Sequence, residues 1–545
     1  MTKTIKFLAG VAVAAFTLAT TSCIDETMPT NGITQDQLDK SQNTVSGLLM
    51  SLPKRMNAMD ARSGNFGDYA IGYGGLMIIR DTETGDFLRP ASDYDHFQSF
   101  ATTEMMGDQY AVTQWLWNYS YQNILAANTL LRAAKSAEAA GDNSNLNKLA
   151  RAEGYAFRAF YYLDAARSFE FLPNDKFSGA NSDGNNVTNL TVPIVTEETT
   201  EEQAKNNPRA TRDVMAKFIL QDLDSAESLV PVIDETSYKG DKTLANLAVV
   251  YGLKARLYMW LEDYTNAAKY AQQSINAAGG LSESTVMTYQ KCLVIDGNKI
   301  AGYQPTCFNQ LSDFMWGVQQ TSEDATVKSG ILNWTSWMSP SAGFSAYAAA
   351  GATPCMDMSM INRMFSGDWR QVFYDATNAA APGVGYKFQP VGGSSETNYL
   401  NGAASAYPLM RIEEMFFIQC EALAHSNPTA AKALLEQFMN EYRNISSGKY
   451  VCTATSKEGI IEEIVYQKRV ELWGEGQTFF DIKRLNYSVT RGYKGTNHQN
   501  EARFNTNGRP AWMNWVMVQT EQNNNQALKG WNNPDPTRAY PVWME

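Results

Sequence analysis

A stripe of small residues in the segment 146–169 constrains this chain more than any other feature of its sequence. The apolar side chains of the segment recur at helical spacing along one face: Ala152, Tyr155, Ala156, Ala159, Leu163 and Ala166. The charged residues of the segment fall off this face. Because most of the stripe is alanine, a neighbouring helix can approach it closely. The sequence therefore predicts a long helix from Leu146 to Phe169 that packs against another helix.

Further helical segments occur in pairs along the chain. Their periodicity predicts helices at Trp115 to about Ala140, Leu244 to Leu261, Asn266 to Ala278, Leu409 to His425, Thr429 to Tyr442 and Lys457 to about Trp473. In the pair at 244–278, Tyr258, Tyr264, Ala267 and Ser274 stand at tetratricopeptide spacing. We therefore predict a mostly α fold, a tetratricopeptide-like helical-pair solenoid of about four pairs with long loop-rich insertions and little strand.

The insertions are two stretches without helical periodicity, at about 60–110 and about 280–405. Both are rich in glycine, serine, asparagine, threonine and aromatic residues, and Leu311 to Gln320 is compatible with one strand. Loops on a rigid scaffold commonly carry binding residues. Since the helical pairs share a core, we expect residues 41–545 to form a single domain that includes both insertions.

The first residues have the layout of a secretory signal. A basic start precedes an apolar run from Phe7 to Leu18, which is too short to cross a bilayer. Small residues then lead to Cys23, and the arrangement resembles a bacterial lipoprotein signal, in which the cysteine is acylated. The resemblance implies a signal peptide at 1–22, lipidation of Cys23 and a flexible tether at 23–40.

The lipid is then the only membrane attachment that we expect. An ordinary secreted protein with an incidental cysteine is the alternative, because Thr20 stands where a leucine is usual. No later segment of the sequence offers a long uncharged apolar run.

Composition bears on partners and cofactors. A net charge of −12 disfavours binding to nucleic acid or to anionic lipid. The cysteines after Cys23 match no zinc spacing; Cys420 is expected to be buried, and a bond between Cys292 and Cys307 stays open. Two oxygen-rich clusters are calcium candidates: Asp81, Glu83 and Asp86, and Asn181, Asp183 and Asn185. Neither fits the twelve-residue calcium loop, so we expect no cofactor, with a structural calcium ion as the weaker alternative.

Three motifs in the helical segments point to a known family. They read RAEGYAFRAFYYLD at 151–164, YPLMRIEE at 407–414 and ELWGEGQTFFDIKR at 471–484. In this order they resemble the motifs of the SusD/RagB lipoproteins, and weaker matches lie at 221–226 and 540–542. The acidic Asp25 and Glu26 resemble the surface-export signal of Bacteroidetes lipoproteins.

The resemblance implies a nutrient-binding outer-membrane lipoprotein that faces the extracellular side. Such proteins bind oligomeric nutrients, most often glycans, and serve a SusC-type TonB-dependent transporter without catalysis of their own. We expect the charged motif residues to form ion pairs and helix-end bonds inside the solenoid: Arg158, Asp164, Arg411, Glu413, Glu471 and Arg484.

A glycan site needs exposed aromatic rings beside polar groups, because a sugar ring has an apolar face and a rim of hydroxyls. Trp334 and Trp337 in the segment NWTSWM are the first candidates for stacking platforms, and Tyr347 follows nearby. The alternative is that the two tryptophans anchor the insertion to the solenoid. Trp369, which stands between Asp368 and Arg370, fits either use.

Tyr73 is a second candidate platform, since glycines on both sides would display its ring. Arg80 and Asp81 would then supply hydrogen bonds to the rim of the sugar. The alternative for these polar residues is an ordinary role in a turn.

The leading hypothesis is a glycan-binding lipoprotein that captures nutrient for a transporter. A peptide-binding member of the same family is the main alternative. A surface glycosidase would need two facing carboxylates, which the sequence cannot pair, and no nucleophile elbow, His-Glu-x-x-His or phosphate loop is present. A scaffold that binds only proteins predicts that the loop tryptophans are buried or lie at the partner contact.

Overall fold

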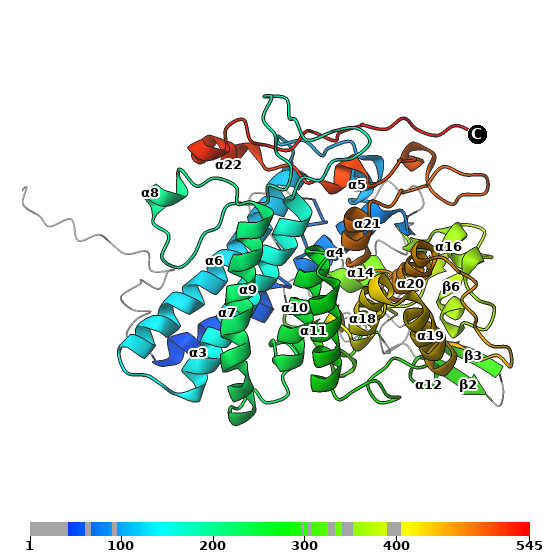
Figure 1. Cartoon of the computed structure of the whole chain (residues 1–545), viewed down its shortest axis with the longest axis horizontal. Coiled ribbons are helices and arrows are strands. Elements are labelled where there is room, and N and C mark those ends of the chain that lie inside the picture. Colours follow the sequence, from blue (N-terminus) through cyan, green and yellow to red (C-terminus); the bar gives the residue numbers. More distant parts are fainter. Residues whose placement is uncertain are drawn as a thin grey trace, which may run out of the picture. The chain divides into compact units, whose positions relative to one another are not determined.

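Helices account for most of the fold (Figure 1). The computed structural model describes residues 42–59, 67–89, 95–296, 299–303, 308–324, 327, 333–340, 352–389 and 405–545. The chain divides into two units, Met1–Thr44 and Val45–Glu545, and the site and core described below belong to the second.

The longer α-helices are α3 (Gln42–Arg55), α4 (Tyr73–Thr84), α6 (Ala111–Ala139), α7 (Asn145–Phe169), α9 (Arg212–Leu229), α10 (Leu247–Trp260), α11 (Tyr264–Ala277), α18 (Ile412–Ser426), α19 (Pro428–Phe438), α20 (Lys457–Glu471) and α21 (Thr478–Leu485). The shorter ones include α5 (Gln98–Thr102), α8 (Glu201–Ala204), α12 (Tyr289–Cys292), α14 (Trp334–Met338), α16 (Met358–Arg363) and α22 (Gln519–Asn524).

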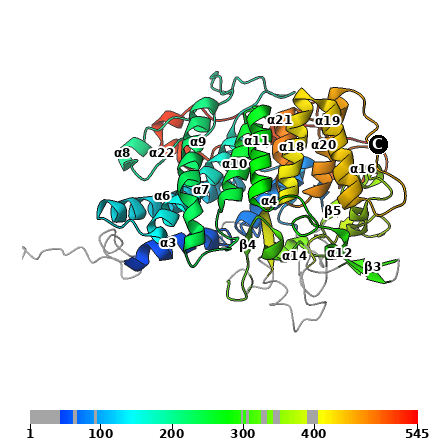
Figure 2. The ribbon, with the colours of Figure 1, turned by 60° about the horizontal axis from the view of Figure 1, so that its bottom comes forward.

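The long helices pack as successive neighbours, and Figure 2 shows them side by side. Helix α6 packs on α7, α7 on α9, and α10 on α11. Helix α11 then contacts α18, which packs on both α19 and α20. The prediction of a mostly helical, tetratricopeptide-like arrangement is confirmed, although α4, α9 and α21 are not among the helices that periodicity predicts.

Polar caps set where the paired helices begin. The Asn246 side chain accepts a hydrogen bond from the Val249 amide at the start of α10, and Asp263 does the same for Asn266 at the start of α11. Between these helices Glu262 has a φ of 59°, so it adopts the left-handed conformation for which glycine is usual. Asn427 caps α19, whose first residue is Pro428.

Short antiparallel strands complete the fold. One four-stranded sheet has the order β1-β5-β7-β6, built from Phe87–Leu88, Cys355–Met356, Val384–Gly385 and Tyr374–Asp375. Strand β2 (Leu293–Asp296) pairs with β3 (Lys299–Tyr303). Strand β4 (Trp316–Gln319) pairs with β8 (Ala406–Met410), Trp316 lying opposite Met410, and so confirms the strand expected within 311–320.

Buried ion pairs tie the helices together. The Arg158 guanidinium donates to both carboxylate oxygens of Asp222 at 2.7 Å, which joins α7 to α9. Arg411 pairs with Glu413, Glu471 and Glu475 at 2.8–3.1 Å, and all four are buried. Fixed arginine forks of this kind set the register of neighbouring helices. The structural role expected for the charged motif residues is therefore confirmed.

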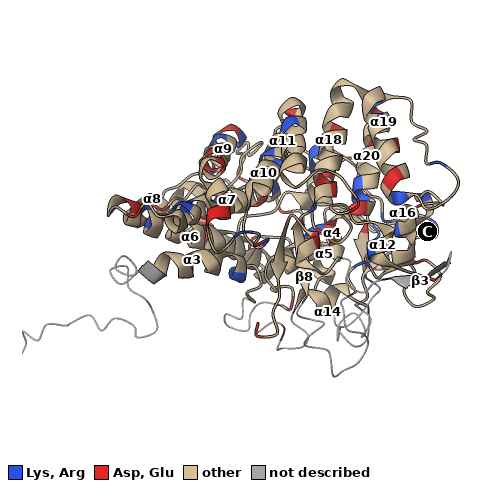
Figure 3. Ribbon diagram, turned by 90° about the horizontal axis from the view of Figure 1, so that it is seen from below, with Lys and Arg blue, Asp and Glu red and all other residues tan. Residues whose placement is uncertain are grey.

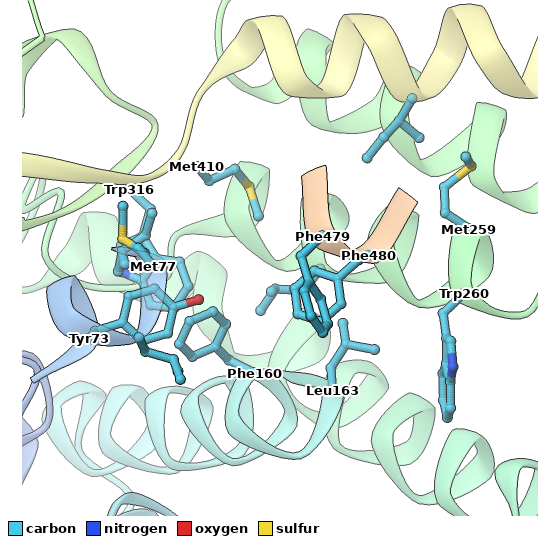
Figure 4. Close-up of a cluster of buried hydrophobic side chains, with 14 of the residues drawn as sticks. Tyr73, Met77, Phe160, Leu163, Met259, Trp260, Trp316, Met410, Phe479 and Phe480 are labelled. Atoms are coloured by element: carbon cyan, nitrogen blue, oxygen red, sulfur yellow. The ribbon is translucent and has the colours of Figure 1, made fainter. Parts of the chain in front are cut away.

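Aromatic and aliphatic side chains from distant parts of the sequence meet in the core. Figure 4 shows Tyr73 beside Met77 and Phe160, with Phe479 and Phe480 close to Leu163. The charged residues lie largely on the helices, whereas the ribbon around β8 and α14 is mostly uncharged (Figure 3). Among the described helices, none has the length and apolar character that a bilayer crossing requires.

Candidate functional site

Trp334 and Trp337, the first predicted platforms, are buried in α14 with exposed fractions of 1% and 0%. The Trp334 ring packs against Tyr407 and Phe388, with ring centroids 5.2 and 4.7 Å apart. Trp337 packs edge-on against Phe97 at 4.9 Å. The expectation that these rings present an open face is therefore wrong, and the alternative, that they anchor the insertion, is what the structure shows.

Gly74 is the physical reason for the burial of Trp334. A Cβ atom at this position would lie 2.6 Å from Cδ1 of Trp334, so only glycine lets the indole lie against α4. The glycines around Tyr73, which suggested a displayed ring, thus permit close packing: Gly74 makes room for Trp334, and Gly72 and Gly75 let the carbonyls of Met56 and Tyr69 approach.

Tyr73, Arg80 and Asp81 do not form an exposed rim either. All three lie in α4, a helix buried along its whole length. The Tyr73 hydroxyl donates to Asp164 Oδ2 at 2.6 Å, and Arg80 donates to the same oxygen at 2.9 Å. Asp81 accepts from the Gly476 amide, and burial raises the pKa of its carboxyl to about 8. The expectation that they are exposed beside a ligand is therefore wrong.

Trp369 is also buried, at 1% exposure, so of its two interpretations the structure shows the packing one. Its Nε1 donates to the Tyr442 carbonyl at 2.7 Å, and the Arg443 guanidinium lies 5.5 Å from its ring centroid. Tyr347 and Cys23 lie outside the described residues, so their predicted roles stay predictions.

Trp531 is the exception among the tryptophans. Ten of the twelve are buried, Trp543 is half-buried, and Trp531 is 39% exposed. It lies in the irregular segment after α22, and among the described residues its ring has no aromatic or hydrogen-bonding partner. An exposed indole without a partner in the fold is what a stacking platform requires.

The backbone around Trp531 is held in place from two sides. Asn181 and Asn185 each donate a side-chain hydrogen bond to the Gly530 carbonyl at 2.8 Å. Arg209, which is buried, donates to the Trp531 carbonyl and to Asn533 Oδ1 at 2.9 Å. The ring is therefore exposed while its backbone is fixed, and little conformational entropy is lost when a ligand stacks on it.

Polar groups lie on the segments that contact the backbone of the platform. The exposed Asp183 lies beside Gly530, its Cβ 3.6 Å from where a Cβ of residue 530 would be. Asn207 and Asn525 exchange hydrogen bonds of 2.9 and 2.7 Å. Asn207 also lines an open depression of about 750 Å³ whose other lining residues are Ile194, Thr196, Glu198, Thr199, Glu202, Gln203 and Asn206. We define Trp531, Asp183 and this depression as the Trp531 surface.

Residues of both calcium candidate clusters form hydrogen bonds within the protein. Asn181 Oδ1 accepts from the amides of Asp183 and Asn185, so this cluster forms a turn. Glu83 accepts from Trp515 Nε1 at 3.0 Å, and burial raises the pKa of its carboxyl to about 8. Within the described ranges, no group of three or more His, Cys, Asp and Glu side chains could hold a metal ion. Cys420 is buried, as expected, whereas Cys307 lies outside the described residues.

Sequence reasoning missed Trp531 because it weighed the middle insertion above the last sixty residues. The local signal is Gly530 before the tryptophan and Asn532, Asn533 and Pro534 after it, in a stretch without helical period. This pattern is typical of an ordered turn that displays its ring.

Comparison with known proteins agrees with the fold. A family model described as the SusD family matches residues 377–542, and one described as starch-binding, associating with outer membrane, matches residues 80–259. The chain therefore belongs to the SusD family. Among curated proteins, no sequence shows significant similarity to it.

Solved structures show the same architecture. A SusD-like carbohydrate binding protein from Bacteroides vulgatus is 19% identical with a TM-score of 0.68, over 90% of this chain and 98% of that one. A putative sugar binding protein from the same species is 17% identical with a TM-score of 0.66, over 91% and 98%. A SusD superfamily protein from Bacteroides thetaiotaomicron is 16% identical with a TM-score of 0.64, over 90% and 99%. At this level of identity the likeness shows the fold alone.

Proposed function

We propose that this chain is a glycan-binding lipoprotein of the cell surface that captures oligosaccharide and delivers it to a SusC-type transporter. The observation that carries the proposal is the Trp531 surface, an exposed indole of fixed backbone beside polar side chains. Membership of a family whose matching model is described as starch-binding and outer-membrane-associated supports the same function.

Binding at this surface follows from the chemistry of sugars. The indole face of Trp531 covers the C–H face of one ring and releases water from both. Carboxylate and amide groups of Asp183, Asn206 and Gln203 then satisfy the hydroxyl rim, because polar groups left without a partner on binding are costly. No bond of the sugar is broken in this process, and each contact is weak enough to be released.

Capture and delivery explain why weak binding suffices. A lipid on Cys23 would hold the protein at the membrane, where it concentrates ligand near the pore of a transporter. The outer-membrane description of the matching family model supports this location. The transporter partner and the extracellular orientation remain parts of the proposal.

The burial of Trp334 and Trp337 is what the scaffold hypothesis expects of the loop tryptophans. The Trp531 surface distinguishes the scaffold hypothesis from the glycan-binding one, because a protein that binds only other proteins is not expected to bind sugar there. Isothermal titration of the chain against pools of oligosaccharides and of peptides tests the proposal, with Trp531→Ala beside the wild type. We expect heat with oligosaccharides only, and its loss in the variant.

Trp543→Ala is the matched control, because Trp543 is the other tryptophan that is not fully buried. We expect this variant to bind oligosaccharide as the wild type does. Binding of peptides in place of sugars would favour the peptide-binding alternative, and release of reducing ends by the purified protein would favour a glycosidase. Binding of neither pool would overturn the proposal.

A further inference from the structure

A cavity whose charged lining residues are mostly basic lies among six of the helices. Its charged lining residues come from the end of α7, the start of α9, and from α10, α18, α20 and α21. The cavity has a volume of about 30 Å³, and six basic and three acidic side chains line it: Arg167, Arg212, Arg256, Lys468, Lys483 and Arg484, and Glu170, Glu414 and Asp481. This charged cavity plays no part in the Trp531 surface.

The three carboxylates of the lining are already engaged by cations. Glu414 accepts from Arg256 Nε and Nη2 at 2.7 and 2.6 Å. Glu170 lies 3.1 Å from Arg212, and Asp481 lies 2.8 Å from Lys468. Each acid therefore compensates one cation of the lining, and positive charge remains.

Neighbouring acids do not remove this excess. Asp164 pairs with Arg167 at 2.6 Å, but Arg80 shares the same carboxylate. Glu421 pairs with Arg484 at 2.7 Å. Lys483 donates only to the backbone carbonyls of residues 167, 168 and 170, at 2.8–2.9 Å, and no carboxylate of the described residues lies within ion-pairing distance of it.

Two buried donors of the lining have no hydrogen-bond acceptor among the described residues: Nη1 of Arg256 and Nε of Arg212, of which the second still lies 3.1 Å from Glu170. A buried donor of a charged group without an acceptor costs about 1–3 kcal/mol or more, so an acceptor at Nη1 of Arg256 would stabilise the fold. A negative acceptor is favoured over a neutral one, because the surroundings already hold more cations than anions.

We propose that the charged cavity binds a small inorganic anion, of the size of chloride, between Arg256, Arg167 and the cations of α20 and α21. A volume of about 30 Å³ admits roughly two water-sized spheres, so it accepts such an ion and excludes a sugar ring. An anion here would join helices of three successive pairs and would therefore act on stability, not on glycan recognition.

The electrostatics of the neighbours agrees with this geometry. Burial, together with the charges of Arg256 and Arg80, lowers the pKa of Arg167 to about 10. Burial lowers the pKa of Lys483 well below its usual value, and Arg509 and Arg209 contribute to the shift. An anion in the cavity would offset this mutual repulsion of the cations.

Thermal unfolding of the full chain at constant ionic strength tests the proposal. Gluconate, which is too large for the cavity, is replaced stepwise by chloride, bromide or phosphate, so that general screening stays constant. We expect halide to raise Tm by about 2 °C or more with a saturable dependence. Stabilisation by phosphate as well would place a tetrahedral ion in the same site, and no response to any of the three would overturn the proposal.

Crystals of the wild-type chain soaked in bromide locate the ion directly. We expect an anomalous peak within hydrogen-bonding distance of Arg256 Nη1, and water density there in its place would contradict the proposal. Arg256→Lys should weaken the apparent halide affinity about tenfold or more. Arg363→Lys is the control, because Arg363 forms an exposed ion pair outside the cavity, and it should leave the halide affinity unchanged. If Arg256→Lys does not fold, the two wild-type measurements still decide.

Discussion

Helix α14 and the segment around Trp531 look alike in sequence and differ in the fold. Each places tryptophan beside asparagine in a stretch with weak helical period. From the sequence alone, each therefore has the aromatic ring and the polar neighbour that a sugar platform requires. In the structure Trp334 of α14 is 1% exposed and Trp531 is 39% exposed. One tryptophan closes the core and the other faces solvent.

The difference lies in what the rest of the chain provides for each ring. α4 offers Trp334 a backbone without a side chain at Gly74, and β8 offers Tyr407 to pack against. For Trp531 the neighbouring segments bind the backbone, through Asn181, Asn185 and Arg209, and leave the ring outside. Whether an aromatic residue is core or platform is therefore decided by its partners and not by its local sequence.

The sharpest test of the comparison is the effect of each tryptophan on stability. Trp334→Ala removes a buried indole from contact with Phe388 and Tyr407, and we expect it to lower the free energy of unfolding by about 3–5 kcal/mol. Trp531→Ala should change it by no more than about 0.5 kcal/mol, because its ring is outside the core. Urea denaturation of both variants measures the two values, and equal losses would break the comparison.

The pH dependence of stability separates the buried region from the exposed one. Burial raises the pKa of Glu83 to about 8, and Trp515 donates to this carboxyl. A raised folded pKa means that the proton is retained in the folded state, so the stabilisation is complete below the unfolded value near 4.5 and is lost as pH rises through about 8.

We therefore expect the wild type to be less stable at pH 8 than at pH 5. Glu83→Gln keeps an acceptor for Trp515 without a charge. It should reduce the difference in unfolding free energy between pH 5 and pH 8 by about 1 kcal/mol or more. Denaturant titrations at the two pH values measure it, and the binding of glycan at Trp531 should be insensitive to the same substitution. An unchanged pH difference in Glu83→Gln would show that this carboxyl ionises in the folded state.

Loss of the platform should act on binding alone. We expect Trp531→Ala to weaken oligosaccharide binding about tenfold or more, as the truncation of a central aromatic contact usually does. Calorimetry with the best oligosaccharide from the pool gives the ratio of Kd values. Unaltered binding would place the glycan on another part of the chain.

The smallest expected effect comes from the backbone beneath the platform. Gly530 has a φ of 75°, so Gly530→Ala costs about 1 kcal/mol and displaces the turn that holds Trp531. Binding should fall, but by less than in Trp531→Ala. Gly495→Ala is the control. Gly495 has a φ of 86°, so the substitution introduces the same backbone strain, but in another turn and with open space around the new Cβ. This variant should bind oligosaccharide as the wild type does.

The positions of most long helices can be predicted from the local sequence, because periodicity and capping depend on neighbouring residues. The boundaries of α7, α10 and α20 lie within three residues of the predicted ones, and the caps at Asn246 and Asp263 are visible in the sequence. Helix α4 is not recognised, since five consecutive polar residues from Arg80 to Thr84 end its apolar run. These polar side chains are buried only because distant residues such as Asp164 and Gly476 satisfy them.

The sequence by itself determined that this chain is a stack of helical pairs of the SusD family, since periodicity, caps and motifs are properties of neighbouring residues. Only the tertiary structure decided which tryptophan faces solvent and where six cations meet around one cavity. Exposure and charge compensation depend on side chains hundreds of positions apart, and no short stretch of sequence contains both members of such a contact.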